Sequence, residues 1–327
     1  MSTHAFTRRQ PLAAAGALAL GVATSRRAAA AETIRQGYQT NIWGTPTYYL
    51  MKSGYLEKHG ISAQDFAVPS GNITMQQMVA GQVDLGTYAG PSFIIGNVKD
   101  GIVAIAVIEN VGKTARITTR KDLNITKVDQ LRGKRIANLT GSSVGNDLVD
   151  VVLPHYGLHK GDYQEIRMNV NDMVAALSAK TVDAMANVEP YNVIAVADGI
   201  GADLLDFSQF DPMPVFMAAT AEMVEKRPDV IVAYLKAWLD AANDFKNNQK
   251  KVNDVIYAFY ASKGYKMSAQ TFATAMSRVE VNPGFPDLKS YMQKQADILI
   301  QNKTIKTVPD WSKALRPDFM AKAKAGA

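Results

Sequence analysis

The stretch AGQVDLGTYAGP (80–91) decides the fold, because it aligns without gaps on AKTVDAMANVEP (179–190) in the second half of the chain. Both segments place a Val-Asp pair at the same offset, as Val83-Asp84 and Val182-Asp183. Both end in a proline, which is well suited to the first turn of a helix. The repeat therefore indicates two similar units, each with a short strand followed by a helix.

A second correspondence lies upstream of the first. Residues 41–61 (NIWGTPTYYLMKSGYLEKHGI) and 138–158 (NLTGSSVGNDLVDVVLPHYGL) each run from a strand end through a helix to Gly-Ile or Gly-Leu. Strand signals at 33–40, 61–68 and 115–120 alternate with helical ones, which is typical of α/β proteins. The sequence thus predicts an α/β chain of two lobes, each a mostly parallel sheet flanked by helices.

Composition narrows the possible chemistry. The chain has 327 residues, 47% of them hydrophobic, which is enough for a full core and suggests two domains. It contains no cysteine, so disulfides, cysteine catalysis and thiolate metal sites are excluded. We expect neither a metal nor a cofactor.

The first 31 residues are expected to be a cleavable export signal. Arg8-Arg9 precede the apolar stretch 11–23, and small residues follow at 28–31. That apolar stretch is shorter than the roughly 20 residues a membrane helix needs. The paired arginines resemble a twin-arginine (Tat) signal, but Pro11 and Ala13 depart from that motif, so Tat and Sec export both stay open. The prediction is a soluble protein of the periplasm.

The export segment also accounts for most of the excess charge. It holds four arginines and no acid, so 32 of the 36 basic residues remain against 30 acidic ones. No basic tract is left, and nothing supports nucleic-acid binding.

Four strand-to-helix turns are the candidate binding positions: 41–46, 88–92, 140–143 and 187–191. In open α/β sheets, ligands bind outside the carboxyl ends of the strands. If the two lobes face each other, these turns meet in one cleft. This is the geometry of a hinged binding protein.

The turn TGSSVG (140–145) allows three interpretations. It fits the G-x-S-x-G pattern of a nucleophile elbow centred on Ser143, but this needs a histidine later in the chain. His155 and His159 lie in or just past the helix that Ser143 would start, and no later histidine exists. A phosphate loop would need a Lys-Ser or Lys-Thr that is missing here. A helix N-terminus that binds an anion remains, with Ser142 or Ser143 as the N-cap.

The other turns contribute aromatic and polar candidates. Trp43 beside Asn41 is either a core residue or an exposed stacking surface. Tyr88 and Tyr191 lie in matched turns, and Glu189 precedes a proline that can start a helix. A carboxylate there could favour a ligand with an amine or serve the helix dipole alone.

Together these segments resemble a known family. GYLEKHGI (54–61), AGQVDLGTYAGPSF (80–93), LRGKRIANLTGSS (131–143) and ALSAKTVDAMANVEPY (176–191) are similar to the nitrate/sulfonate/taurine solute-binding proteins of ABC importers. Relatives that bind thiamine-precursor pyrimidines are similar too. The resemblance spans roughly residues 32–250.

The resemblance implies a two-lobe, flytrap-like (type II) periplasmic binding fold. Two crossovers would fall near Thr118–Arg120 and Pro212–Met217. Lobe one would then comprise residues 32–118 and 215–327, and lobe two residues 119–214. The binding residues implied are Asn41, Trp43, Gly90, Pro91, Ser92, Thr140, Gly141, Ser142, Ser143, Glu189 and Tyr191, with Tyr88 added from its matched turn.

The predicted function is a monomeric periplasmic receptor that delivers a ligand to an inner-membrane ABC permease and performs no covalent chemistry. The ligand would be a small organic anion or zwitterion, such as a sulfonate or taurine, or a nitrate-like anion. Thr140, Ser142 and Ser143 would hold the acidic end, Trp43 the body and Glu189 any amine. A planar heterocycle or aromatic carboxylate, an enzyme on the same fold, and a receptor that feeds a sensor kinase remain alternatives.

Overall fold

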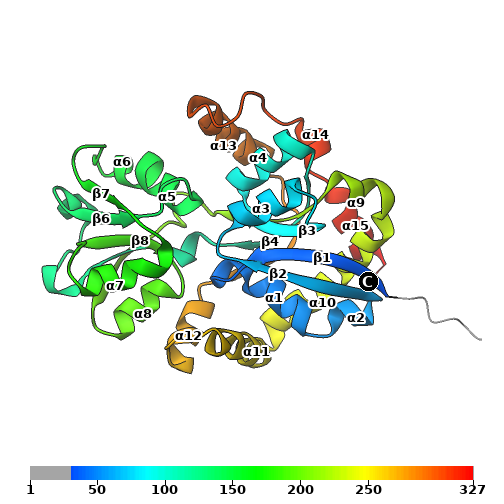
Figure 1. The fold of residues 1–327 in the computed structure, drawn as a ribbon, viewed down its shortest axis with the longest axis horizontal. Coiled ribbons are helices and arrows are strands. Elements are labelled where there is room, and N and C mark those ends of the chain that lie inside the picture. Colours follow the sequence, from blue (N-terminus) through cyan, green and yellow to red (C-terminus); the bar gives the residue numbers. More distant parts are fainter. Residues whose placement is uncertain (1–30, 327) are drawn as a thin grey trace, which may run out of the picture. The chain divides into compact units, whose positions relative to one another are not determined.

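Two β-sheets organise the chain (Figure 1). The computed structural model describes residues 31–326, so the predicted export signal lies outside the described residues except for Ala31. The strands of the first sheet are β1 (Glu32–Gln39), β2 (Ile61–Val68), β3 (Leu85–Ala89), β4 (Val103–Asn110), β10 (Pro214–Ala219) and β11 (Glu280–Gly284). Those of the second sheet are β5 (Ala115–Arg120), β6 (Arg135–Asn138), β7 (Gln164–Arg167), β8 (Ala184–Val188) and β9 (Gly201–Asp206).

Apart from β11, the two sheets share one strand order. The first runs β11-β4-β10-β3-β1-β2 and the second runs β9-β5-β8-β6-β7. In the first sheet β1 is parallel to β2 and β3, and β10 is antiparallel to β3 and β4. In the second sheet β6 is parallel to β7 and β8, and β5 is antiparallel to β8 and β9. The second sheet therefore has one reversed strand, β5, and the first has two, β10 and β11, because β11 is also antiparallel to β4.

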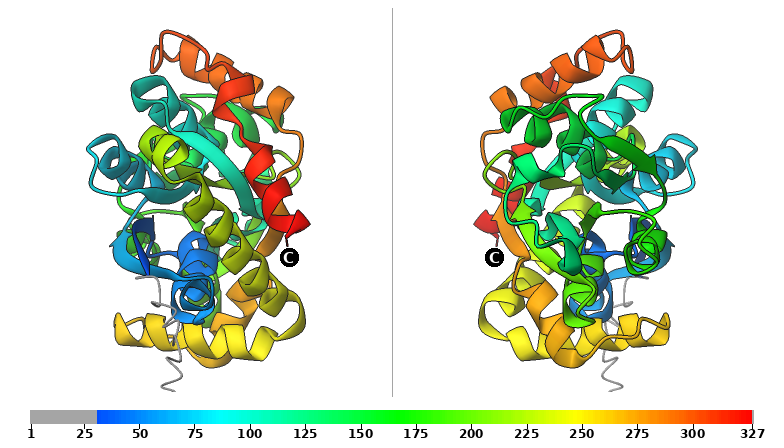
Figure 2. Two further views of the ribbon diagram at one scale, coloured as in Figure 1. Left: turned by 90° about the vertical axis from the view of Figure 1, so that its right-hand side faces the viewer. Right: turned by 90° about the vertical axis from the view of Figure 1, so that its left-hand side faces the viewer.

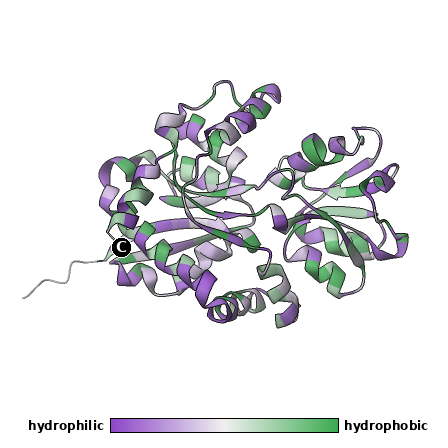
Figure 3. Ribbon diagram, turned by 180° about the vertical axis from the view of Figure 1, so that it is seen from behind, coloured by the Kyte–Doolittle hydropathy of each residue, from purple (hydrophilic) through white to green (hydrophobic). Residues whose placement is uncertain are grey.

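Helices cover the sheets (Figures 1 and 2). They are α1 (Thr45–Lys52), α2 (Tyr55–Lys58), α3 (Gly71–Val79), α4 (Gly90–Asp100), α5 (Ser143–Asp147), α6 (Leu153–His155), α7 (Met173–Ser178), α8 (Tyr191–Ala197), α9 (Ala221–Lys226), α10 (Pro228–Asn247), α11 (Gln249–Ser262), α12 (Ala269–Met276), α13 (Lys289–Gln301), α14 (Trp311–Ala314) and α15 (Pro317–Ala325). One core cluster runs through both sheets and includes residues of α1, α10 and α11, and another lies between the first sheet and α3, α4 and α13. Figure 3 shows hydrophobic and hydrophilic residues alternating along the outer helices, as expected for helices with one buried side.

An ion pair repeats in the two sheets and supports the alignment of 80–91 with 179–190. In the first sheet, Asp84 accepts hydrogen bonds from the backbone N–H of Arg35 at 2.8 Å and from its guanidinium Nε at 3.1 Å. In the second, Asp183 accepts the same two bonds from Arg135, at 2.9 and 3.1 Å. The Arg135 guanidinium holds the pKa of Asp183 below its usual value. Each of these aspartate–arginine contacts, which we call the aspartate clamps, joins two neighbouring parallel strands: β1 with β3, and β6 with β8.

The second predicted correspondence holds for the order of elements. Residues 41–61 run from the end of β1 through α1 and α2 to β2, and residues 138–158 run from the end of β6 through α5 and α6. In the sheets, Gln36 lies opposite Leu85 and Ile136 lies opposite Ala184, so Gln36 matches Ile136.

The first crossover lies earlier than expected. The strand Ala115–Arg120 pairs with β8 and β9, so the chain enters the second sheet through residues 111–114 and not at 118–120. The return from β9 to β10 runs through residues 207–213, which overlaps the expected position. The division into two lobes stays a prediction, with its first boundary moved to about residue 114.

Candidate functional site

A cavity of about 540 Å³ lies where turns from the two sheets meet. The residues that line it from the first sheet's side are Gln39, Asn41, Trp43, Pro69, Ser70, Gly71, Asn72, Ala89, Pro91, Ser92, Ile95, Leu299, Asn302 and Thr304. From the second sheet's side they are Leu139, Thr140, Gly141, Ser142, Ser143, Val144, Asn146, Arg167, Val170, Ala186, Asn187 and Val188. Most of them follow the carboxyl ends of strands, where ligands of open α/β sheets bind.

The structure brings most of the predicted residues to this cavity. Those that line it are Asn41, Trp43, Pro91, Ser92, Thr140, Gly141, Ser142 and Ser143. Four others, Tyr88, Gly90, Glu189 and Tyr191, are not among its lining residues.

The turn after β6 is shaped by hydrogen bonds that use its first serine. Ser142 is the N-cap of α5: its hydroxyl donates to the carbonyl oxygen of Leu139 at 2.7 Å and accepts from the N–H of Gly145 at 3.0 Å. A Cβ on Gly145 would lie 2.2 Å from that same carbonyl oxygen, so only glycine fits there. Ser143 begins the helix, and its N–H has no intrahelical partner. Ser143 and the first-turn amides, not Ser142, are therefore the groups left for a ligand.

The other polar groups of this turn do not form a catalytic triad. The hydroxyl of Thr140 donates to Glu165 at 2.6 Å. Of the candidate bases, His155 packs edge-on against Phe210, and no histidine is among the residues that line the cavity. Ser143 thus has no general base beside it among the described residues, and its position suits hydrogen bonding.

Trp43 is both a core residue and a cavity residue. Asn41 caps the short turn that carries it, because the Asn41 side chain accepts from the Trp43 backbone N–H at 3.0 Å. The indole N–H donates to the hydroxyl of Thr114 at 2.7 Å, and the side chain is 8% exposed. Thr114 lies in the first crossover, so Trp43 fixes a turn of the first sheet to the connection between the sheets.

Glu189 is engaged by another part of the chain. It is fully buried, and its carboxylate pairs with Arg278 and accepts from the N–H of Val193 at 3.0 Å. Arg278 also pairs with Asp203 of β9 at 2.9 Å. Burial raises the pKa of Glu189, and the nearby Arg278 opposes that rise. The Glu189 carboxylate is therefore not free for its predicted role of binding an amine of the ligand.

The remaining predicted residues also have other partners. Tyr88 is fully buried, and its hydroxyl lies 3.1 Å from the Met78 sulfur. Gly90 is a buried residue at the start of α4. The hydroxyl of Tyr191 bonds to Asn171 and lies 2.9 Å from the hydroxyl of Tyr265. All three positions are packed between elements and are not lining residues of the cavity.

The sequence analysis did not predict two polar residues of the cavity, the charged Arg167 and the amide Gln39. Arg167 is the one ionisable side chain among the lining residues. Arg167 is the last residue of β7, a short strand (QEIR) without a hydrophobic pattern. Its place at the carboxyl end of a strand is the signal that could have identified it. Gln39 is the last residue of β1, whereas the prediction began two residues later, in the turn.

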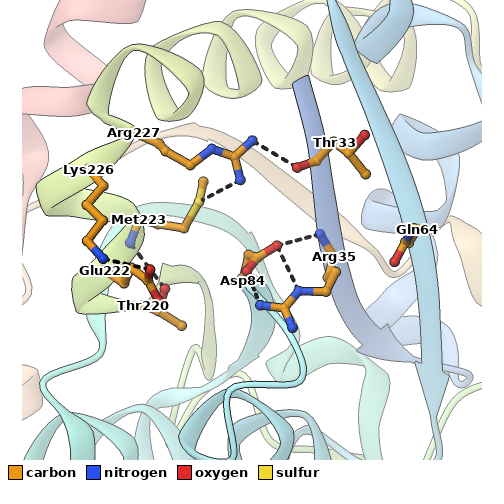
Figure 4. A pocket seen from close by; sticks show the side chains of 9 residues that line it. All are labelled: Thr33, Arg35, Gln64, Asp84, Thr220, Glu222, Met223, Lys226 and Arg227. Carbon is orange, nitrogen blue, oxygen red and sulfur yellow. Dashed lines mark hydrogen bonds and ion pairs between the residues drawn. The ribbon is translucent and has the colours of Figure 1, made fainter. Parts of the chain in front are cut away.

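A second, smaller hollow of about 380 Å³ lies at the opposite ends of the first sheet's strands (Figure 4). Each of its charged side chains already has a partner, which for Arg227 is Glu32 outside the hollow. Arg35 pairs with Asp84 at 2.5 Å, and Lys226 pairs with Glu222 at 3.0 Å. The guanidinium of Arg227 donates to the carbonyl oxygen of Thr33 at 2.8 Å. With these partners satisfied, the hollow offers a ligand much less than the larger cavity does.

Two buried carboxyl groups meet beside the second crossover. Asp211 accepts hydrogen bonds from the Met213 N–H at 2.7 Å, from Gln295 at 2.9 Å and from the Tyr291 hydroxyl at 3.1 Å. Asp147, in α5, has a buried carboxyl oxygen with no partner among the described residues. Burial, followed by the adjacent Asp211, raises the pKa of Asp147. Burial also raises the pKa of Asp211, and the hydrogen bonds that it accepts from Met213 and Tyr291 oppose that rise.

Comparison with known proteins fits this architecture. A family model described as NMT1/THI5 like matches residues 41–252, more than half of the chain. The chain belongs to the NMT1/THI5-like family. It is 28% identical over 233 residues to a binding protein of Brucella abortus (strain 2308), covering 69% of this chain and 71% of that one. It is 23% identical to an ABC transporter periplasmic binding protein of Brachyspira hyodysenteriae, covering 77% of this chain and 76% of that one.

Solved structures share the fold. The periplasmic aliphatic sulphonate binding protein SsuA from Escherichia coli superimposes with a TM-score of 0.74 at 23% identity, covering 86% of this chain and 91% of that one. The expected two-sheet periplasmic binding protein fold is thereby confirmed. Among the residues the structure describes, no helix is both long and apolar enough to cross a membrane.

Proposed function

We propose that this chain is the periplasmic substrate-binding component of an ABC importer and that it captures a small organic anion. The observation that carries the proposal is the cavity of about 540 Å³, which strand-end turns of both sheets line together. A ligand held by both sides stabilises the arrangement in which the sheets approach, because it binds that arrangement best. The inner-membrane permease would recognise this arrangement.

The chemistry of the lining favours an anion over a zwitterion. No carboxylate lines the cavity, and the one expected to hold an amine, Glu189, is paired with Arg278. The first-turn amides at Ser143 and the Ser143 hydroxyl would hold the acidic end of the ligand. Trp43 would pack against the body of the ligand, which also suits a planar heterocycle or an aromatic carboxylate.

Small-angle scattering and thermal denaturation test the proposal with a panel of sulfonates, aromatic carboxylates and nitrate. We expect one class to raise the melting temperature by mass action, to reduce the radius of gyration and to be recovered unchanged. Ser92→Tyr, which fills the cavity, should abolish both effects, whereas the same change at exposed Ser262 should preserve them.

Two results would reject the proposal in different ways. A particle whose dimensions never change with any member of the panel would exclude a hinged receptor. A chemically altered compound after incubation would favour an enzyme on the same fold.

A further inference from the structure

Two polar residues that line this cavity from different sheets can make different contacts with a ligand. Arg167 at the end of β7 supplies the positive charge, and Gln39 at the end of β1 supplies a hydrogen-bond acceptor. We propose that the ligand, within the proposed receptor function, is an organic anion with a neutral O–H or N–H donor, bound between Arg167 and Gln39.

Arg167 is available to a ligand. Its side chain is exposed and forms no ion pair or hydrogen bond among residues 31–326. The nearest acid along its strand, Glu165, is occupied by the Thr140 hydroxyl at 2.6 Å and the Asn138 amide at 2.8 Å. An arginine can bind a carboxylate or sulfonate through paired hydrogen bonds, which suits either acid group.

Gln39 is oriented by its neighbour. The side chain is 2% exposed, and its Nε2 donates to the carbonyl oxygen of Thr87. Two carbonyl oxygens cannot hydrogen-bond to each other, so the nitrogen must face Thr87 and Oε1 must face away. Oε1 is buried, has no partner among the described residues, and belongs to a residue that lines the cavity. A buried acceptor is costly to leave unpaired, so a ligand donor there gains more than an ordinary exposed hydrogen bond.

The donor must be neutral because of what the cavity lacks. None of its lining residues is acidic, and the aromatic one, Trp43, already donates its indole N–H to Thr114. An ammonium group entering this cavity would lose water without gaining a counter-charge. It would also face the positive charge of Arg167. The cavity therefore selects a hydroxyl or amide over an amine.

Three sulfonates of nearly equal size test which end group the cavity prefers. Isethionate ends in a hydroxyl, taurine in an ammonium and propanesulfonate in a methyl group. We expect isethionate to bind about fivefold or more tighter than propanesulfonate, because it alone gives Gln39 a neutral donor. We expect it to bind about tenfold or more tighter than taurine. The same comparison on a ring uses p-phenolsulfonate and p-toluenesulfonate, in case Trp43 requires an aromatic body.

Variants assign each preference to its residue. Arg167→Gln should weaken all the sulfonates about tenfold or more without changing the preference for the hydroxyl over the methyl group, and should leave the unliganded melting temperature unchanged. Removing the exposed charge of Lys160 by Lys160→Gln is the matched control and should change neither. Gln39→Met should erase the preference for the hydroxyl over the methyl group. Because Gln39 is buried, its variant is compared only through this ratio of affinities, which folding stability does not alter.

The outcomes separate this inference from the proposed function. If taurine or propanesulfonate binds as well as isethionate, or if Arg167→Gln leaves affinity intact, the inference is wrong while the receptor function stands. If none of the five sulfonates binds, the inference is wrong, and the aromatic carboxylates and nitrate of the wider panel then decide the receptor function.

Discussion

The contact between Arg278 and Glu189 gives the most direct test of how the two sheets are joined. Arg278 follows α12, and Glu189 follows β8 of the second sheet. The Glu189 side chain is 0% exposed and that of Arg278 is 20% exposed, so water screens this pair poorly. Arg278→Met removes the guanidinium but keeps much of the apolar stem.

The expected loss follows from the burial of Glu189. Removing one partner of a buried ion pair leaves a charge without compensation and costs about 3–5 kcal/mol. At about 2 °C per kcal/mol for a chain of this size, the melting temperature should fall by about 6–10 °C. Glu189→Gln in the same background removes the stranded charge, so the double variant should recover about 2 kcal/mol of that loss.

The loss should depend on pH in a definite direction. Without Arg278, burial alone acts on Glu189 and raises its pKa further above the ordinary value of 4.5. A carboxyl whose pKa is higher in the folded state takes up a proton on folding, so its contribution to stability is lost as pH rises from the unfolded value towards the folded one. The gap between wild type and Arg278→Met should therefore be large at about pH 7 and narrow towards about pH 4.

Urea denaturation at about pH 7 and about pH 4 gives the free energies of unfolding of four proteins: wild type, Arg278→Met, Glu189→Gln and the double variant. A loss below about 1 kcal/mol at pH 7, or a gap that does not narrow in acid, would show that Glu189 is not a buried charge held by Arg278.

Three further predictions concern the turns and the buried acids. Trp43→Phe keeps an aromatic ring but loses the indole hydrogen bond, so the unliganded protein should lose about 1–2 kcal/mol in a urea titration; unchanged stability would show that this bond is not formed. Gly145→Ala should cost about 1–3 kcal/mol by thermal denaturation, because the new methyl group would lie 2.2 Å from the Leu139 carbonyl oxygen; a neutral result would mean that the turn is more open. Because burial raises the pKa of Asp147, the folded protein takes up a proton there and stability should fall as pH rises from about 5 to about 8. Asp147→Asn should flatten that dependence, and an equally steep curve in the variant would assign it to another group.

The fold could be predicted from the sequence because its signals are local. The strand expected at 61–68 is observed over the same residues, and the helix expected from Pro91 begins at Gly90. Helix-starting prolines, glycine stops and runs of β-branched residues act within a few positions of the chain. The repeat of Val-Asp added a long-range constraint, and the two aspartate clamps explain why it exists.

The site could be predicted only in part, because side-chain direction and distant partners are not local. Tyr88 is inside a strand whose side chains alternate between faces, and it points into the core instead of the cavity. Glu189 is neutralised by Arg278, 89 residues further along the chain. Arg167 ends a strand of mostly polar residues, without the hydrophobic run that marked the others.

The bond from Trp43 to Thr114 has a practical consequence for following this protein in solution. The chain has three tryptophans, and Trp238 and Trp311 do not line the cavity, whereas Trp43 does. Its indole also touches the segment that connects the sheets, so a ligand in the cavity or a movement of that segment would change its surroundings. The emission spectrum of the unlabelled protein would therefore report either event.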